Sequence, residues 1–425
     1  MIFKNFSILL GEKDYLKKPR RSAFGLFYKK SVLFYIVNCL KISAQLCYHF
    51  YNEYAGEIIM AYDFNKIISN FALDGELVSC ERYGEGHINE TYLAVIKKGD
   101  KTTDYILQKI NNKIFKNVEG LMRNITLVTE YVREKVKSAG GNPDRESLSL
   151  VYTKDGKSYI FDQDSQGYFR IYKFITDAIA YQQVEKPEHF YQSAVAFGNF
   201  AKTLAEFDSS EIFDVIPDFH NTEKRMRDFK ASLSADKFDR AKDAKKEIEF
   251  VLSREEYCGK IVSLLRSGKM PTKVTHNDTK LNNVMLDAKT GEPVAVIDLD
   301  TIMQGSICYD FGDSIRFGCN HSAEDEKDLS KVNFDIELFE AYAEGYLSAV
   351  GDGATDIEKE YLPLGAILMT YECGMRFLAD YLDGDVYFRT KREGQNLDRC
   401  RTQFKLVEDM EKVLPEMQKI VKKYS

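Results

Sequence analysis

Three absences narrow the kinds of protein that this 425-residue chain can be. None of its eight cysteines stands in a C-x-x-C pair, which argues against zinc or haem attachment and predicts reduced thiols in a cytoplasmic protein. No run of about 20 apolar residues is present, so no membrane span is predicted. The chain also lacks an excess of basic residues, since 59 Lys and Arg stand against 66 Asp and Glu, which argues against a nucleic-acid-binding protein.

What is present predicts a globular enzyme joined to a segment of different composition. Apolar residues make up 44% of the chain, which excludes a disordered or collagen-like protein. Residues 1–59 carry 9 basic and 4 acidic side chains, whereas the remainder carries 50 and 62. The codons for Gly56 and Glu57, just before Met60, can form a bacterial ribosome-binding sequence. We therefore expect residues 1–59 to be an extension, either upstream sequence that is not translated or an unstructured segment.

The segment 60–175 has the pattern of a small sheet with one helix. Strand-like stretches at 77–83 and 91–95 flank a glycine turn, and further strands are predicted at 104–110, 147–153, 158–161 and 168–174. Apolar residues at helical spacing predict a long helix over 117–136, which stops before the Gly-Gly-Asn-Pro sequence at 140–143. Together these patterns predict a small antiparallel sheet with one long helix.

From residue 176 onward, helical patterns dominate. They cover 190–207, 223–232, 239–252, 254–267, 335–350, 358–382 and 397–424, and a β-rich segment at 273–301 interrupts them. The sequence thus predicts an α+β fold with two lobes. The N-lobe is expected at 60–175, the larger and mainly helical C-lobe at 176–425, and a hinge near Phe174 and Thr176.

The segment 276–300 carries the chemistry that the sequence predicts. It reads His-x-Asp-x-x-x-x-Asn over 276–283, followed by a short hairpin and an apolar strand that ends at Asp298. In the protein-kinase signature with this spacing, the first Asp, here Asp278, accepts a hydroxyl proton, and the residues at the positions of Asn283 and Asp298 bind magnesium. Carboxylates this close together repel one another unless a divalent cation is bound. A solvated turn with an N-capping Asp is the alternative, and the joint spacing of the three residues favours the kinase site.

A literal Asp-Phe-Gly sequence at 310–312 also matches a kinase motif, but at the wrong distance. Asp310 stands 32 residues after Asp278, whereas Asp298 stands 20 residues after it, at the end of the strand that follows the hairpin. We therefore assign the metal to Asp298 and expect Asp310 and Asp313 to support the site. His276 is expected to support the loop by hydrogen bonding and not to act as a base.

On the nucleotide side, a glycine turn and one basic strand residue are the candidates. Gly84 and Gly86 lie between two strands, where backbone amides could cover phosphates, although an ordinary hairpin turn gives the same pattern. Lys109 is the candidate for pairing with the phosphates, but side chains alternate along a strand, so only one of Gln108 and Lys109 faces the nucleotide. The candidate nucleotide-binding residues are Gly84, Gly86, Lys109, Phe174 and Thr176.

Four motifs resemble the aminoglycoside phosphotransferase/choline kinase superfamily and, within it, the bacterial N-acetylhexosamine 1-kinases. They are Tyr-Gly-Glu-Gly-His-Ile-Asn at 83–89, the segment 276–301 discussed above, 310–318, and Glu-Cys-Gly-Met-Arg-Phe-Leu-Ala-Asp-Tyr at 372–381. The likeness runs from about Met60 to the C-terminus. It implies a protein-kinase-like fold and the ATP- and Mg²⁺-dependent phosphorylation of the anomeric hydroxyl of N-acetylglucosamine or N-acetylgalactosamine.

The resemblance also implies roles for individual residues. By position, Asp278 would be the base, Asn283 and Asp298 the Mg²⁺ ligands, and His87, Arg376 and Tyr387 would line the sugar pocket together with Asp278. We expect a cytoplasmic monomer or weak dimer whose partners are ATP and an N-acetylhexosamine, without nucleic acid or membrane.

Two other functions stay open at this point. Arg376 and Asp380 are four residues apart and could simply pair on a helix face. The acids Asp380, Asp383 and Asp385 would suit a cationic substrate, so a kinase for an aminoglycoside, choline or methylthioribose-like alcohol is the first alternative. The second is a non-catalytic pseudokinase scaffold, against which the complete catalytic motif argues.

Overall fold

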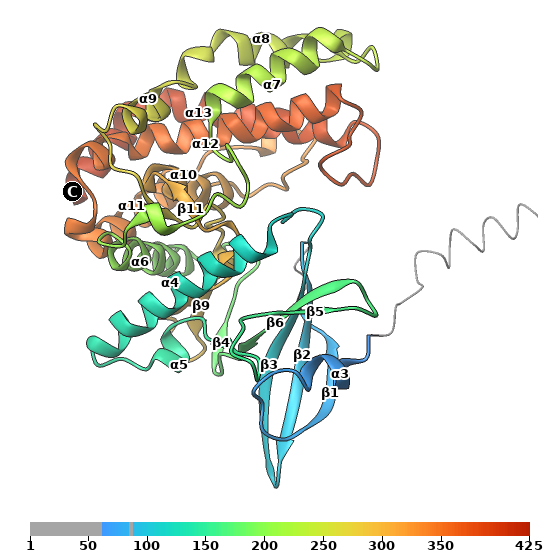
Figure 1. Cartoon of the computed structure of the whole chain (residues 1–425). Coiled ribbons are helices and arrows are strands. Elements are labelled where there is room, and N and C mark those ends of the chain that lie inside the picture. Colours follow the sequence, from blue (N-terminus) through green and yellow to red (C-terminus); the bar gives the residue numbers. More distant parts are fainter. Residues whose placement is uncertain (1–61, 85–87) are drawn as a thin grey trace, which may run out of the picture. The chain divides into compact units, whose positions relative to one another are not determined.

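An antiparallel sheet forms the first part of the described chain, which comprises residues 62–84 and 88–425 of the computed structural model (Figure 1). Its strands are β1 (Glu76–Arg82), β2 (Glu90–Lys98), β3 (Lys101–Ile110), β4 (Leu150–Val151), β5 (Ile160–Asp162) and β6 (Gly167–Lys173). They lie in the order β1-β2-β3-β6-β4, and β5 also pairs with β6. The predicted extension 1–59 and the candidates Gly86 and His87 lie outside the described residues.

The two faces of this sheet pack against different helices. The residues of one face, among them Ile106, Ile110 and Tyr172, join the core that contains the long helix α4 (Val118–Ser138). On the other face lies α3 (Phe64–Ile68), whose Phe64 ring is 4.9 Å from the ring of Tyr92. Because side chains alternate, each strand position is assigned to either the α4 face or the α3 face.

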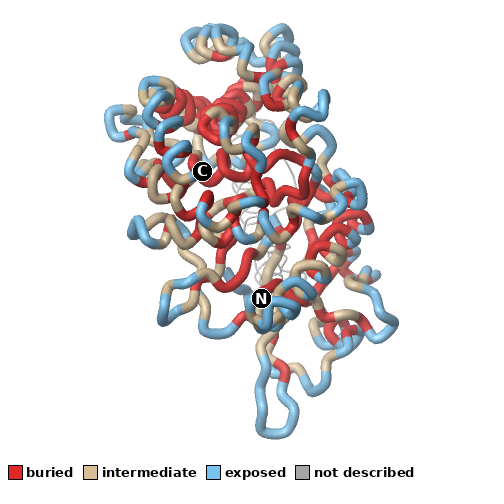
Figure 2. The backbone as a smooth tube through the Cα atoms, turned by 90° about the vertical axis from the view of Figure 1, so that its left-hand side faces the viewer, coloured by how far each residue is buried: buried red, intermediate tan, exposed pale blue. Residues whose placement is uncertain are grey.

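The rest of the described chain is mainly helical. Its helices are α5 (Pro143–Glu146), α6 (Pro187–Thr203), α7 (Thr222–Ala235), α8 (Lys245–Ser253), α9 (Lys260–Arg266), α10 (Ile307–Gly318), α11 (Ile336–Val350), α12 (Asp356–Leu382) and α13 (Gln395–Tyr424). Its short strands are β7 (Ala178–Ile179), β8 (Lys273–Thr275), β9 (Val284–Asp287), β10 (Pro293–Val296) and β11 (Met303–Gly305), which pair as β10-β9-β7 and β11-β8. Buried residues concentrate among these helices (Figure 2).

Two close contacts fix the elements that flank the catalytic segment. A side chain at Gly312 would come within 2.3 Å of the carbonyl oxygen of Gly365, so α10 and α12 approach closely only because both positions lack one. At the start of β8, Nζ of Lys273 lies 2.6 Å from Oε2 of the fully buried Glu358. Glu358 also forms a capping box with Thr355 at the start of α12. The buried helix α12 thus anchors the strand that leads into the catalytic loop.

The predicted fold is confirmed, with a few local differences. The chain has an antiparallel-sheet N-terminal region with one long helix and a larger helical part. The sequence analysis missed α10, although its apolar residues recur at helical spacing; ten of its twelve residues are buried. The helices expected from 239 and 254 begin only at Lys245 and Lys260. Among the described residues, no helix is long and apolar enough to cross a bilayer.

Candidate active site

The catalytic loop connects β8 to β9, and a buried carboxylate from α10 fixes its shape. The backbone N–H groups of His276 and Asn277 donate to the two carboxylate oxygens of Asp310, at 2.8 and 2.7 Å. Asn277 has a left-handed backbone with φ of 63°, which Asn tolerates better than most residues. Burial raises the pKa of Asp310, while the two N–H donors act in the opposite direction. Asp310 therefore supports the loop, as its distance from Asp278 in the sequence predicts.

Both ring nitrogens of the fully buried His276 are engaged within the site. The backbone N–H of Asp278 donates to Nδ1 at 3.3 Å, and Nε2 lies 2.9 Å from the carbonyl oxygen of Ile297. Because Nδ1 accepts, we assign the proton to Nε2, which donates to Ile297. His276 thus connects the loop to the residue before Asp298 and has no nitrogen left to act as a base.

Asp278 lies in this loop between a cation and an amide. Nζ of Lys280 is 2.6 Å from Oδ1 of Asp278. Nδ2 of Asn283 donates to the backbone oxygen of Asp278 at 2.8 Å and to its Oδ2 at 3.1 Å. Burial alone would lower the pKa of Lys280, but the charges of Asp278 and Asp313 outweigh it and raise that pKa. The carboxylate of Asp278 is therefore held beside a fixed positive charge.

Asp298 follows the end of β10 and stays accessible to solvent. Its backbone is left-handed, with φ of 59° and ψ of 61°, a conformation that Asp and Asn adopt more readily than most residues. The surrounding protein reduces the hydration of this carboxylate. That desolvation, followed by the negative charges of Asp300 and Asp278, raises the pKa of Asp298 to about 7. The direction of this shift shows that the described side chains do not fully compensate its negative charge.

Asn283 and Asp298 fit a magnesium ion that would also bind substrate phosphates. Because Asp278 holds the amide nitrogen of Asn283, the amide oxygen is the ligand atom that this residue can offer. Within the described ranges, no group of three or more His, Cys, Asp or Glu side chains could hold a metal ion. Magnesium at phosphate sites takes one or two protein ligands together with phosphate oxygens and water. One amide oxygen and one uncompensated carboxylate are consistent with such a site.

A buried ion pair connects the sheet to the segment that carries Asp298. Arg170 of β6 is 1% exposed, and its Nη1 lies 2.6 Å from Oδ1 of Asp300. The amide of Asn89 donates to the other oxygen of Asp300 at 2.5 Å. Burial alone would lower the pKa of Arg170, but the charge of Asp300 outweighs it and raises that pKa. We call Arg170 and Asp300 the bridging pair, because their ion pair joins β6 to the segment after β10 that carries Asp298.

Gln108 and Lys109 lie on opposite faces of the sheet. Oε1 of Gln108 accepts hydrogen bonds from Nε and Nη2 of Arg170, at 3.0 and 2.8 Å, so Gln108 faces the bridging pair. Lys109 lies on the α3 face, and its Nζ is 3.6 Å from Oε1 of Glu90. Alternation keeps the two side chains apart, and the contact of Lys109 with a nucleotide stays a prediction.

A ring contact relates two of the other candidates on the nucleotide side. Gly84 follows β1 with φ of +73°, which favours glycine. The ring of Phe174 meets that of Tyr83, the residue before Gly84, edge to face, with centroids 5.9 Å apart. Thr176 is exposed just beyond β6. The contact of these residues with a nucleotide stays a prediction.

Arg376 of α12 is surrounded by aromatic rings. Its guanidinium carbon lies 5.6 Å from the ring centre of Phe219, 5.7 Å from that of Tyr387 and 5.5 Å from that of Phe388. It makes no hydrogen bond or ion pair to any described residue, and so it does not pair with Asp380. An Arg has about five N–H donors, and here they stay available to a ligand. The structure thus brings Arg376 and Tyr387 together.

The acids near Arg376 are used to fold the chain. The carboxylate of Asp380 accepts hydrogen bonds from the backbone N–H groups of residues 386–388, at 2.9, 2.7 and 3.0 Å. Asp383 accepts a bond of 2.8 Å from a serine hydroxyl of α7, and Oδ2 of Asp385 lies 2.6 Å from Nη1 of Arg240. These three carboxylates therefore shape the turn that carries Tyr387.

A cavity of about 380 Å³ opens beside the catalytic loop. Its lining includes Phe219, His220, Asn277 and Tyr309. Asn277 directly precedes Asp278, and Phe219 is one of the rings around Arg376. This cavity is therefore the candidate acceptor site.

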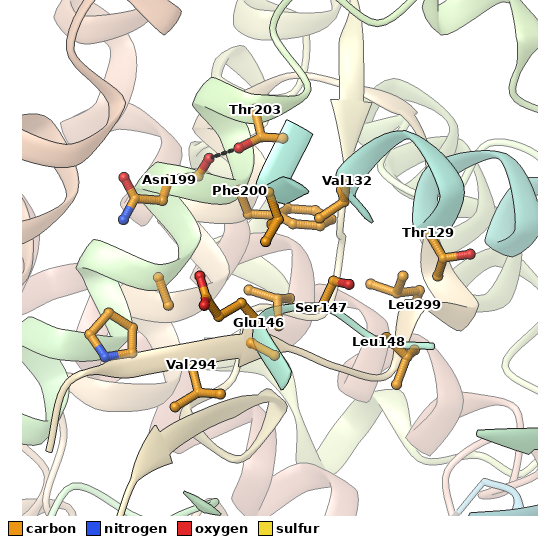
Figure 3. Close-up of a pocket in the computed structure, with 15 residues that line it drawn as sticks. Thr129, Val132, Glu146, Ser147, Leu148, Asn199, Phe200, Thr203, Val294 and Leu299 are labelled. Carbon is orange, nitrogen blue, oxygen red and sulfur yellow. Dashed lines mark hydrogen bonds between the residues drawn. The ribbon is translucent and has the colours of Figure 1, made fainter. Parts of the chain in front are cut away.

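A second cavity, of about 200 Å³, lies behind β10 (Figure 3). Side chains from α4, α6 and β10 line it, among them Val132, Phe200 and Val294, and most of its lining is apolar. None of the predicted site residues lines this cavity or the 380 Å³ cavity, but this one also has no lining residue next to Asp278 or among the rings around Arg376. It lies where side chains of α4, α6 and β10 meet.

Three functional candidates escaped the sequence analysis, although each carries a signal. Lys280 and Asp300 each stand two residues after a predicted catalytic residue, so they lie close to it in any extended segment. Arg170 is a single charged residue within the otherwise apolar and aromatic stretch 168–172, which indicates a buried ion pair. Its partner could not be found from the sequence, because the contact spans 130 residues.

Comparison with known proteins identifies the family. The profile of the phosphotransferase enzyme family matches residues 79–355. A microcompartment-associated aminopropanol kinase superposes with a TM-score of 0.53, at 14% identity over 84% of this chain and 98% of that one. An aminoglycoside phosphotransferase from Alicyclobacillus acidocaldarius gives a TM-score of 0.52, at 13% identity over 84% of this chain and 96% of that one. The two superpositions show a shared protein-kinase-like fold, and the profile match shows that the chain belongs to the phosphotransferase enzyme family.

Proposed function

We propose that the protein transfers the γ-phosphoryl group of ATP to the anomeric hydroxyl of an N-acetylhexosamine, with magnesium as the cofactor. Family membership supports phosphoryl transfer to a small molecule. The observation that carries the choice of acceptor is Arg376, whose donors are unused and whose guanidinium lies beside Tyr387. Such donors suit the carbonyl oxygen of an acetamido group and the hydroxyl oxygens of a sugar ring.

The charges around Arg376 favour an uncharged acceptor. Burial, and after it the charge of Arg376, lower the pKa of Arg225, so the two guanidinium groups lie near enough to repel each other. A cationic acceptor would add a third positive charge here. The acids near this pair already have partners: Glu372 bonds to His220, Asp228 pairs with Lys224, and Asp380 and Asp385 accept hydrogen bonds or an ion pair. An uncharged sugar ring avoids this repulsion.

The loop geometry supports a direct, in-line transfer. Asp278 orients the acceptor hydroxyl and takes its proton as the new P–O bond forms, while the bond between the γ-phosphorus and the ADP oxygen breaks. An anomeric hydroxyl is more acidic than an ordinary alcohol, so a carboxylate is an adequate base. Lys280 lies beside Asp278 and is placed to meet the negative charge of the transferred group. Magnesium held by Asn283 and Asp298 would neutralise charge on the phosphates.

A substrate panel with product identification tests this function. The enzyme is assayed for ADP release with N-acetylglucosamine, N-acetylgalactosamine, glucose, choline, ethanolamine and an aminoglycoside, with the Asp278→Asn variant as the blank. Phosphorus NMR then locates the phosphate on the product. We expect a sugar 1-phosphate, recognisable by its lability in acid. Phosphate at another hydroxyl, or no turnover with either acetamido sugar, would refute the proposal.

A kinase for a cationic alcohol is the second candidate, and one observation favours it. Asp214 and Asp218 both line the cavity beside the catalytic loop. Burial, and after it the charge of Asp218, raise the pKa of Asp214, so the two carboxylates repel each other and would be relieved by a cation. In this case the same panel would show higher kcat/KM for the amino alcohols than for the sugars, and Asp214→Asn would lower activity only with the cationic acceptors.

A further inference from the structure

The wall of the 380 Å³ cavity contains two buried polar atoms without a partner. The hydroxyl of Tyr309 and Nε2 of His220 make no hydrogen bond to any residue that the structure describes. Tyr309 is 3% exposed, and the side chain of His220 is 8% exposed. A buried polar atom without a partner costs stability, so most such atoms in native proteins are satisfied. Two of them on one cavity wall indicate that a ligand completes their hydrogen bonding.

A buried carboxylate fixes the orientation of His220. Oε1 of Glu372, which is 1% exposed, lies 3.0 Å from Nδ1 of His220. A carboxylate can only accept, so Nδ1 carries a proton and donates to Glu372. In the neutral ring, Nε2 is then an acceptor, directed by a fixed partner on the other side of the ring. The ring of Tyr309 lies 5.3 Å from that of His220, so both polar atoms can reach one ligand.

The cavity wall and Arg376 share one aromatic residue. Phe219 lines the cavity, and its ring centre is 5.6 Å from the guanidinium carbon of Arg376. Asn277, on the same wall, directly precedes the proposed base Asp278. Arg376 stands one helical turn after Glu372 on α12, so a ring-shaped ligand that contacts Phe219 lies near both Arg376 and His220, beside the catalytic loop.

We propose that His220 and Tyr309 bind the acceptor, with Nε2 of His220 accepting a hydrogen bond from a ring hydroxyl of a neutral polyol and Glu372 acting as the positioning residue. This inference rests on the proposed function and extends it, because it assigns acceptor contacts in addition to Arg376 and Tyr387. Nε2 of His220 and the hydroxyl of Tyr309 fit a ligand that offers O–H donors in several directions. A sugar ring has them, whereas a quaternary ammonium group has none.

The test separates binding from folding at Tyr309. Removing an unpartnered buried hydroxyl does not destabilise a fold, so Tyr309→Phe is expected to leave the melting temperature unchanged or raise it. If that hydroxyl binds the acceptor, the same variant raises the KM for the acceptor roughly tenfold and leaves the KM for ATP unchanged. Tyr346→Phe is the matched control, because Tyr346 is also fully buried with an unpartnered hydroxyl but does not line the cavity. It should change neither KM.

A pair of substitutions tests His220 in the same way. His220→Asn keeps an amide nitrogen where Nδ1 meets Glu372 but removes the atom that faces the cavity, whereas His220→Gln places an amide at the Nε2 end. We expect His220→Asn to raise the acceptor KM at least tenfold and His220→Gln to recover part of that loss. Glu372→Gln should raise the acceptor KM less than His220→Asn does, because the ring stays in place without a fixed tautomer.

The outcomes distinguish this inference from the proposed function. Acceptor KM values within twofold of wild type for both Tyr309→Phe and His220→Asn would overturn the inference, even if acetamido sugars are the substrates. If the wild-type enzyme phosphorylates a cationic alcohol instead, the proposed function fails, and the role of the two residues is scored on the KM for that alcohol. A wild-type enzyme that phosphorylates no member of the panel overturns both.

Discussion

The two sides of the candidate active site satisfy their polar groups in opposite ways. On the metal side, defined by Asp278, Asn283, Asp298 and the bridging pair, most polar groups contact another described residue, and the carboxylate of Asp298 is the group that does not. On the acceptor side, defined by Phe219, His220, Tyr309 and Arg376, the hydroxyl of Tyr309, Nε2 of His220 and the guanidinium of Arg376 have no hydrogen-bond partner within the described chain. The difference indicates that the groups for phosphoryl transfer are held in place before substrate binds, whereas the groups for recognition are completed by the acceptor.

The sign of the charge also differs between the two sides. Asp278, Asp298 and Asp300 make the metal side negative, and burial, followed by the charges of Asp300 and Asp278, raises the pKa of Asp298. On the acceptor side the charges are mixed, because Arg225 and Arg376 are positive whereas Asp214 and Asp218 on the cavity wall are negative. A magnesium–nucleotide complex and an uncharged acceptor fit these two environments better than a cationic acceptor does. The following predictions test this difference, beginning with the largest expected effect.

Replacing Asp278 by Asn should cause the largest loss of catalytic activity. The amide has nearly the same shape but cannot take the hydroxyl proton, so we expect kcat to fall by about 10³-fold or more. Binding of ADP, measured by calorimetry, should stay within about twofold of wild type, because the nucleotide contacts are unchanged. Turnover above about a tenth of the wild-type rate would show that Asp278 is not the base.

Asp298→Asn and Asp310→Asn should fail in different ways. Asn tolerates the left-handed backbone at 298, so Asp298→Asn should fold. Its activity should fall by at least about 10²-fold, and Mg²⁺ with ADP should no longer raise its temperature of thermal unfolding. Asp310→Asn replaces one of two acceptors by a donor that faces a backbone N–H, so it should cost about 1–3 kcal/mol of unfolding free energy. A greater loss of Mg²⁺-dependent stabilisation in Asp310→Asn would reverse our assignment of the metal.

The bridging pair offers a test of the link between the sheet and the metal side. Arg170→Met leaves the carboxylate of Asp300 buried without its cation, and such a loss costs about 3–5 kcal/mol of unfolding free energy. The double variant Arg170→Met/Asp300→Asn removes both charges and should recover part of this loss. Urea unfolding measures the energies, and the KM for ATP should rise in Arg170→Met. Asp300→Asn alone is measured as well. If the losses of unfolding free energy in Arg170→Met and Asp300→Asn simply add in the double variant, the pair does not act as a unit.

The sequence could predict a candidate metal side because its residues are close together along the chain. Asp278, Asn283 and Asp298 lie within one loop, hairpin and strand, so their spacing alone places them in one site. The strands and long helices were also predictable, since most of them have one buried and one exposed face. Local pattern and local chemistry agreed in this part of the molecule.

The acceptor side could not be predicted in the same detail, because its contacts join distant segments. His220 precedes α7 and Glu372 belongs to α12, and no local pattern indicates that they meet. Only the resemblance pointed to Arg376 and Tyr387. The sequence left Gln108 and Lys109 open for a related reason: alternation shows that the two side chains point in opposite directions but not which of them lies beside Arg170. The structure shows that Gln108 does.

Arg376→Lys should sharpen the description of the acceptor side. A lysine keeps the charge but loses the planar set of donors, so we expect the acceptor KM to rise roughly tenfold while the KM for ATP stays the same. Arg254→Lys is a suitable control, because Arg254 also lies over an aromatic ring, Phe250, but pairs with Glu411 away from the site. A parallel rise in both KM values for Arg376→Lys would mean that this residue shapes the whole cleft.

Asp383→Asn should have the smallest effect on activity if the acceptor is a neutral sugar. A larger effect is expected only for a cationic acceptor, so this variant separates the two kinds of acceptor. The carboxylate of Asp383 accepts a hydrogen bond from the hydroxyl of Ser232, and an amide oxygen can accept the same bond, so the fold should be kept. If the acceptor is a neutral sugar, removing this charge should change kcat/KM by less than about twofold, since the screened interaction with an uncharged ligand is small. If the acceptor is a cation held by these acids, kcat/KM for that alcohol should fall clearly while the KM for ATP does not. Measuring both acceptor classes on this one variant therefore shows whether the acids near Arg376 only fold the turn or also bind the substrate.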